Sequence, residues 1–232
     1  MPAGSSDRLA ANAAGFVYIP VSSSSCSGFL IGTDVVMTNS HCVPDAAHAV
    51  GVEVNFRFET AWRWDDVVRC ERFLGADATL DYALVGCEGH PGDRYGVLDL
   101  DDRVRADQTP IALLHQQCDW VHTPDCEPTK KVSPGKTTGV RSIHVSHDAY
   151  SLGGSSGGAI IRAGTTHVAA INKSHSLPDA ATGQTGANYG TPMSDIVPQL
   201  RAHFPGVLDP CAPFAATGVL VDEDDACATL TG

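Results

Sequence analysis

Short runs of alternating hydrophobic and polar residues, separated by turn-forming residues, recur along the chain. In the run 50–58, apolar Val and Phe residues at the even positions alternate strictly with Gly, Glu, Asn and Arg. A period of two predicts a strand with one buried face and one face in water. Similar short apolar runs predict further strands at 16–20, 26–32, 35–38, 67–74, 82–87, 110–114, 139–145, 159–162 and 167–171.

A helical pattern occurs near the C-terminus. Ser194 is expected to cap a helix over residues 195–204, whose apolar residues Ile196, Leu200 and Phe204 share one face.

The remaining segments are expected to be loops or tails. Residues 1–15, rich in Ala, Gly and Ser, predict a flexible lead. The acidic, loop-rich segment 88–108 is expected to cross between two halves of a domain that spans 16–204. In the extension 205–232, the acidic run 222–225 is interpreted as a solvated face. Calcium binding is the alternative, but the run lacks the spaced ligands of a known calcium loop.

The composition excludes several classes of protein. A formal net charge of −12 argues against binding of nucleic acid, whose phosphates require a basic face. No apolar run approaches the length of a membrane span. Among the eight cysteines there is no Cys-x-x-Cys pair, which argues against a zinc or redox site. We expect no metal and no cofactor, and a monomer.

The segment Leu152–Gly158 (Leu-Gly-Gly-Ser-Ser-Gly-Gly) holds a serine, Ser156, in a Gly-x-Ser-x-Gly pattern. Glycines allow a tight turn and a close approach to a ligand. Such a loop can expose a hydroxyl group and direct backbone N–H groups at one point, as acyl transfer requires. Taken alone, the pattern is also typical of a plain loop.

Two upstream motifs change this interpretation. Ser40-His41-Cys42 follows the predicted strand 35–38, and Asp81 begins the motif Asp-Tyr-Ala-Leu. The order His, Asp, Ser is one known arrangement of a catalytic triad along a chain. With the Gly-x-Ser-Gly-Gly loop, these motifs make residues 16–204 resemble the chymotrypsin-like (trypsin-fold) serine peptidases.

The resemblance implies an all-β fold of two six-stranded antiparallel β-barrels with a C-terminal helix. It implies a serine endopeptidase that acts on peptides or proteins. Ser156 would be the nucleophile, His41 the general base and then acid, and Asp81 the residue that orients the histidine. The backbone N–H groups of Gly154 and Ser156 would form the oxyanion hole.

Eight cysteines, an even number, favour disulfides and an oxidising compartment. The resemblance implies a Cys26–Cys42 bridge. Proximity in sequence then favours Cys70–Cys87, Cys118–Cys126 and Cys211–Cys227. The first 14 residues lack a secretory signal. We expect a secreted or periplasmic protein whose signal has been removed.

Ser155 departs from the family pattern. Trypsin-like zymogens carry an Asp at this position, which pairs with a newly freed N-terminus, and the chain has no Ile-Val-Gly-Gly start. We therefore expect activity without that ion pair. In this respect the chain is closer to the bacterial glutamyl endopeptidases than to zymogen-activated trypsins.

By resemblance, Tyr150 and Ser151 would form the floor of the substrate pocket, and Asn172, Lys173, Ser174 and His175 its wall. No acidic residue stands at the floor, so cleavage after Arg or Lys is not expected. Tyr150 could fill the pocket and favour small side chains. Alternatively, Ser151, Lys173 and His175 could bind an acidic one, although Asn172 replaces the pocket histidine of glutamyl endopeptidases.

Two other functions are compatible with these motifs. Gly-x-Ser-x-Gly also marks the nucleophile of α/β-hydrolases, which would make the protein an esterase. That fold requires a helix directly after the serine and its Asp and His later in the chain. A non-catalytic peptide- or glycan-binding module on the same fold is the other alternative, because a fold alone does not prove activity.

Overall fold

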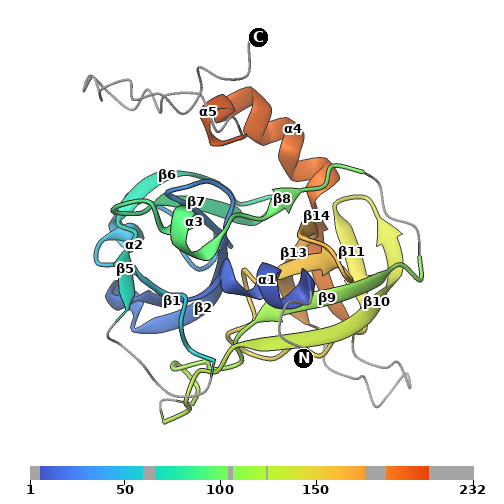
Figure 1. Ribbon diagram of the computed structural model, residues 1–232, viewed down its shortest axis with the longest axis horizontal. Helices are drawn as coiled ribbons and strands as arrows, with labels where there is room; N and C mark the ends of the chain where they lie inside the picture. The colour runs from blue at the N-terminus through green and yellow to red at the C-terminus, as the bar shows by residue number, and fades with distance from the viewer. Residues whose placement is uncertain (1–5, 60–65, 104–106, 124, 176–186, 209–232) are drawn as a thin grey trace.

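Two seven-stranded β-sheets lie side by side (Figure 1). The computed structural model describes residues 6–59, 66–103, 107–123, 125–175 and 187–208. All strands of the first sheet come from residues 14–86, and all strands of the second come from residues 99–192.

The first sheet has the strand order β5-β4-β1-β2-β3-β7-β6. Its strands are β1 (Ala14–Ile19), β2 (Ser24–Leu30), β3 (Val35–Thr38), β4 (Glu53–Asn55), β5 (Val67–Arg69), β6 (Arg72–Asp77) and β7 (Tyr82–Gly86). The two edge strands, β5 and β6, follow each other in the chain with two residues between them. The chain itself therefore joins the two edges of this curled sheet.

The second sheet has the order β12-β9-β10-β11-β14-β13-β8, and β12 also pairs with β13. Its strands are β8 (Asp99–Leu100), β9 (Pro110–His115), β10 (Lys131–Arg141), β11 (His144–His147), β12 (Ala159–Arg162), β13 (His167–His175) and β14 (Asn188–Pro192). The pairing of β12 with β13 closes a barrel of six antiparallel strands, and β8 adds to it in parallel.

The all-β, chymotrypsin-like fold is confirmed, with one difference in detail. The second barrel is closed and has six strands as predicted. The first is a seven-stranded half-barrel, because the run 67–74 forms two strands, β5 and β6, that leave the sheet open between them. The strand β12 follows Ser156 where an α/β-hydrolase would have a helix, which excludes that fold.

The predicted strand 50–58 is much shorter in the structure. Only β4 forms a ladder, because Gly51 adopts a left-handed backbone (φ 74°) and leaves Val50 62% exposed. The even residues from Val52 to Phe58 are nevertheless buried as predicted. The predicted strand 139–145 is instead the tip of a hairpin, since Ser142 (φ 49°) lies between β10 and β11.

Within the described residues, five α-helices lie outside the sheets. They are α1 (Ser6–Asn12), α2 (Ala46–Ala49), α3 (Pro91–Tyr95), α4 (Met193–His203) and α5 (Pro205–Leu208), and a 3-10 turn, η1, covers Pro20–Ser22. The prediction of a flexible lead over 1–15 is wrong for residues 6–15, which form α1 and the start of β1; residues 1–5 are outside the described residues.

The helix α4 begins two residues earlier than predicted. Its N-cap is Pro192 rather than Ser194, so Pro198 lies in the second turn of the helix. The apolar face is as expected, with Ile196, Val197 and Leu200 buried.

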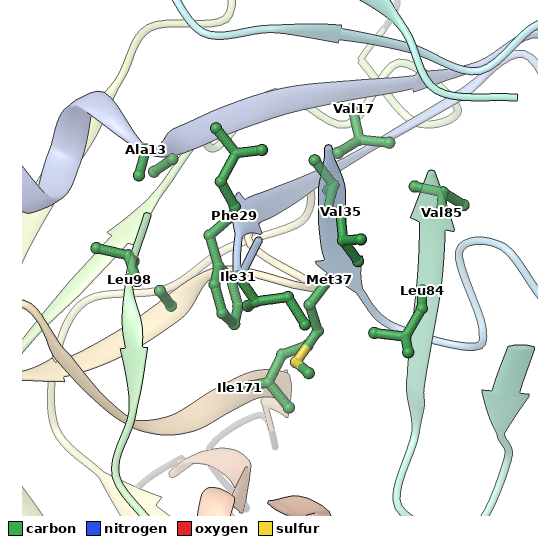
Figure 2. Close-up of a cluster of buried hydrophobic side chains, with 14 of the residues drawn as sticks. Ala13, Val17, Phe29, Ile31, Val35, Met37, Leu84, Val85, Leu98 and Ile171 are labelled. Atoms are coloured by element: carbon green, nitrogen blue, oxygen red, sulfur yellow. The ribbon is translucent and has the colours of Figure 1, made fainter. Parts of the chain in front are cut away.

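One large hydrophobic core extends through both halves of the molecule. Figure 2 shows Phe29, Val35 and Met37 of the first sheet with Ile171 of the second in the same cluster. A smaller core fills the second barrel and contains Ile111, Leu113, Val145, Ala149, Ile160 and Ala170. Since the large core is shared by both sheets, it fixes their relative position and so the site between them.

Three of the predicted disulfides are present: Cys26–Cys42, Cys70–Cys87 and Cys118–Cys126. The fourth, Cys211–Cys227, lies outside the described residues. Three disulfides indicate an extracellular or otherwise oxidising compartment. Across the described ranges, every helix is too short or too polar to cross a membrane.

Candidate active site

An open groove of about 660 Å³ takes its lining from both sheets. Lys173 and Ser174 contribute from β13 of the second sheet. The first sheet and its loops provide Ser40, His41, Pro44, Ala76, Ala78 and Asp81. The groove therefore brings residues of both halves to one surface.

His41 and Asp81 form a hydrogen-bonded pair in this groove. Antiparallel pairing of β3 with β7 places Thr38 opposite Ala83, so the residues that follow β3 lie beside Asp81. Nδ1 of His41 is 2.9 Å from Oδ2 and 3.1 Å from Oδ1 of Asp81. The strand register thus orients the imidazole so that Nε2 is left for another group.

The carboxylate of Asp81 is held by several donors. The hydroxyl of Ser40 donates to Oδ1 at 2.8 Å, and the backbone N–H of His41 donates to the same atom at 3.0 Å. Asn39 Nδ2 donates to the Asp81 carbonyl at 2.6 Å. These contacts support the left-handed backbone of Asp81 (φ 56°), a conformation that Asp tolerates better than most residues.

Two opposing effects act on the pKa of Asp81. Burial of the carboxyl group raises it. The hydrogen bond and positive charge of His41, with the donors on His41 N and Ser40, outweigh burial and hold the pKa below its ordinary value of 3.8. Asp81 is therefore an anion at neutral pH and favours a proton on Nδ1 of His41.

Ser156 reaches the same region from the loop between β11 and β12. Its carbonyl accepts a hydrogen bond of 2.7 Å from the backbone N–H of Ser27, in β2. Its Oγ donates to the carbonyl of Lys173 at 3.4 Å. Because Lys173 lines the groove with His41, this contact puts the hydroxyl of Ser156 at the edge of the groove. Among the described residues, Ser156 Oγ makes no hydrogen bond to His41.

Gly157 has a left-handed backbone (φ 81°) and permits this close approach of the two halves. A Cβ atom at this position would overlap the carbonyl oxygen of Ser27 and the hydroxyl of Thr38, and would lie 3.2 Å from the backbone nitrogen of Asn39. Any larger residue would therefore push the loop away from the turn that carries His41.

Two backbone N–H groups of the serine loop (Leu152–Gly158) lack a hydrogen-bond partner among the described residues. Neither Gly154 N nor Ser156 N donates a hydrogen bond to any described residue. The carbonyl of Gly154 points elsewhere, since it accepts from Ser27 Oγ at 2.9 Å and from Gln116 Nε2 at 3.0 Å. Free N–H groups beside a hydroxyl can bind an oxyanion.

A disulfide lies against the imidazole. The sulfur atoms of Cys26 and Cys42 and a ring nitrogen of His41 all lie within 4.8 Å of one another. Metal binding at this cluster would require thiolates, but the two sulfurs are bonded to each other. The cluster is thus a structural support for the turn that carries His41.

The residues predicted to form the substrate pocket have different environments. Tyr150 is 60% exposed, so this residue lies largely in solvent. Ser151 is buried. Lys173 and Ser174 line the groove. The backbone of His175 pairs with Asn188 in β14.

Asn172 lies behind the predicted wall rather than on its surface. It is 2% exposed, and its Nδ2 donates to the Ser155 carbonyl at 2.9 Å and to Ser151 Oγ at 3.3 Å. Its Oδ1 is 3.1 Å from Nε2 of His147. Asn172 therefore supports the serine loop from behind.

Several supporting roles were not predicted from the sequence. Ser27, Gln116 and Asn172 hold the backbone of the serine loop, and Asn39 and Ser40 hold Asp81. Ser40 has a local signal, because it belongs to the Ser-His-Cys motif. Ser27 and Gln116 have none, since they lie 127 and 38 residues from their partner Gly154.

Comparisons with known proteins agree with the fold. A search of curated proteins found no match. The solved structure of a Glu endopeptidase is 16% identical and has a TM-score of 0.64, with 83% of this chain and 91% of that chain covered. The Rv3671c protein from M. tuberculosis H37Rv, in an inactive form, is also 16% identical with a TM-score of 0.64, and 91% of this chain and 97% of that chain are covered.

The active form of the Rv3671c protease is 15% identical, with a TM-score of 0.63 over 88% of this chain and 87% of that chain. At this level of identity, the solved structures show the fold. The sequence itself matches the trypsin-like peptidase domain over residues 26–171, more than half of the chain. The protein therefore belongs to the family of trypsin-like peptidase domains.

Proposed function

We propose that the protein is a serine endopeptidase in which Ser156 is the nucleophile, His41 the general base and then acid, and Asp81 the orienting residue. The observation that carries this proposal is the His41–Asp81 pair at 2.9 Å, in a groove whose other side contacts the hydroxyl of Ser156. A peptide or protein substrate follows from membership of the family.

A serine hydroxyl is a poor nucleophile at neutral pH and needs a base. The hydroxyl of Ser156 would turn from the carbonyl of Lys173 to Nε2 of His41. As Oγ attacks the scissile carbonyl carbon, the proton passes to Nε2. The anionic Asp81 stabilises the imidazolium that forms and keeps the other proton on Nδ1.

The imidazolium of His41 then protonates the amine of the leaving peptide, and the C–N bond breaks. An ester between Ser156 and the new carboxyl end remains. Water attacks this ester and gives a proton to His41. His41 then returns that proton to Oγ of Ser156 as the ester bond breaks, which releases the acid and restores the hydroxyl of Ser156.

The tetrahedral intermediates carry a negative charge on oxygen. The free N–H groups of Gly154 and Ser156 would bind this oxyanion. In comparable enzymes one such donor contributes about 3 kcal/mol to transition-state stabilisation. Their freedom from other hydrogen bonds supports this role.

A fluorophosphonate probe tests the nucleophile. The wild-type protein should be labelled at Ser156, and Ser156→Ala should abolish labelling. Ser22→Ala, which removes an exposed hydroxyl on η1, is the matched control and should be labelled at the wild-type rate. A wild-type protein that stays unlabelled would contradict the proposal and favour a non-catalytic binding module.

Digestion of a denatured protein mixture tests the reaction. Mass spectrometry should find new termini at internal bonds, as expected for an endopeptidase, and none with Ser156→Ala. Hydrolysis of simple esters without any peptide cleavage would instead make the protein an esterase. The residues before the new termini also give the specificity, and identify any preference for acidic or small side chains.

The compartment is part of the same proposal. Disulfides such as the three seen here form and persist mainly in secreted and periplasmic proteins. We therefore expect the enzyme to act outside the cytosol, and to lose activity when these bonds are reduced.

A further inference from the structure

A buried chain of hydrogen bonds connects the serine loop to the interior of the second barrel. Ser155, next to Ser156, has no exposed surface, and its Oγ lies 2.8 Å from Nδ1 of His115 at the end of β9. Nε2 of His115, a residue that is 1% exposed, lies 2.9 Å from the hydroxyl of Ser133 in β10. The link thus runs from the loop into two strands of the barrel.

A neutral imidazole satisfies every polar atom of this network. With its proton on Nδ1, His115 donates to Ser155 Oγ and accepts at Nε2 from the hydroxyl of Ser133. Ser155 Oγ also accepts from Leu152 N at 3.1 Å and donates to the carbonyl of Gln116 at 3.2 Å. No charged group or chain end is needed to bury Ser155.

The position of Ser155 controls the direction of the neighbouring N–H group. Its carbonyl accepts from Asn172 Nδ2 at 2.9 Å and from Gly158 N at 3.1 Å. Because a trans peptide is planar, the N–H of Ser156 must then point away from this carbonyl. The side chain of Ser155 and its carbonyl together fix the peptide plane that presents Ser156 N.

We propose that His115 is a positioning residue that holds the serine loop, through Ser155, in the conformation that leaves Gly154 N and Ser156 N free for an oxyanion. The inference rests on the proposed function. In this inference, the uncharged contact between His115 and Ser155 has the role that a buried ion pair has in zymogen-activated relatives.

Two isosteric substitutions separate positioning from simple packing. In His115→Asn, the amide stands where Nδ1 stands in histidine and can still bond to Ser155. In His115→Gln, the amide stands near the place of Nε2 and reaches Ser133 instead. Both variants keep a polar amide in the barrel, so they differ chiefly in which serine they can contact.

The inference predicts that the two variants differ in kcat. His115→Asn should retain kcat within about threefold of the wild type. His115→Gln should lose roughly 10- to 100-fold in kcat, with little change in KM, because the oxyanion donors act mainly in the transition state. Labelling of Ser156 by a fluorophosphonate should slow in parallel.

Ser155→Ala removes the contact from the loop side and should behave like His115→Gln. His203→Asn, on the exposed surface of α4, is the matched control and should match the wild type. Equal kcat values for His115→Asn and His115→Gln, with Ser155→Ala also near the wild-type value, would overturn the inference. A wild-type protein that the probe does not label would instead overturn the proposed function.

Discussion

Acid should destabilise the folded protein through His115. Burial disfavours the charged imidazole and lowers its pKa from 6.5 to about 4; the carbonyl of Gln116 opposes this shift, and positive charge on His147 and Lys131 adds to it. In the unfolded chain the ring is in water and has its ordinary pKa. His115 therefore takes up a proton on unfolding at any pH between these two values.

The sign and size of the effect follow from this difference in proton binding. Because the unfolded state binds more protons between pH 6.5 and about 4, the free energy of unfolding decreases as the pH falls through this window. One pKa unit corresponds to about 1.4 kcal/mol, so a difference of roughly 2.5 contributes about 3 kcal/mol. Below about pH 4 the ring is protonated in both states, and the loss is complete.

Urea unfolding at a series of pH values from 7 to 4, with the disulfides intact, measures this contribution. The wild type should lose about 3 kcal/mol more than His115→Asn across this range. His147, whose pKa is also lowered by burial, is present in both proteins, so most of its contribution cancels in the comparison. His203→Asn should keep the wild-type dependence. Parallel curves for the wild type and His115→Asn would refute the reasoning.

Three further predictions concern the active site. Asp81→Asn should lower kcat for peptide hydrolysis by about 10⁴-fold, because the amide favours the wrong tautomer of the histidine; steady-state kinetics measures this. Gly157→Ala should lower the free energy of unfolding, measured with urea, by about 3 kcal/mol or more, because its backbone is left-handed (φ 81°) and the added Cβ would overlap backbone atoms. Gly164→Ala is the control: its backbone is also left-handed (φ 76°), but no atom lies within 4 Å of the added Cβ, so the loss should be about 1 kcal/mol. Protein that begins at Met1 should be active without trimming, because Ser155 is hydrogen-bonded to uncharged groups; activation only after removal of N-terminal residues would contradict this.

Strands with short-range signals could be predicted from the sequence. The runs Val35–Thr38 and Ala159–Arg162 match β3 and β12 at both ends. Both are short, mainly apolar runs that begin directly after Asp34 or Gly158, so the local pattern and the tertiary environment favour the same conformation. The motifs at His41, Asp81 and Ser156 likewise lie at strand ends, where the pattern placed them.

Other strands depend on the presence of a partner strand, which the alternation of apolar and polar residues does not reveal. Residues 50–58 alternate throughout, yet a ladder needs a partner, and the two described partners, β1 and β5, pair only with Glu53–Asn55. The strand β14 (Asn188–Pro192) was missed because it contains Gly190 and Pro192 and has no apolar run. It forms a strand because β11 and β13 pair with it on both sides.

The serine loop shows why the catalytic motif could be predicted and its support could not. A Gly-x-Ser-Gly-Gly pattern records only the requirements of the loop backbone itself, namely the left-handed conformations at Gly154 and Gly157. Some of the groups that hold this backbone come from distant parts of the chain, such as His115, 40 residues from Ser155, or from the other half of the molecule, such as Ser27. The sequence shows His115 only as a histidine at the end of an apolar strand. Its contact with Ser155 can be recognised only in the folded structure. A buried ion pair at this position would need an acidic residue, but the loop has Ser155 there. Ser155 therefore needs an uncharged partner in the interior. His115 is such a partner, because it lies within hydrogen-bonding distance of both Ser155 in the loop and Ser133 in the barrel.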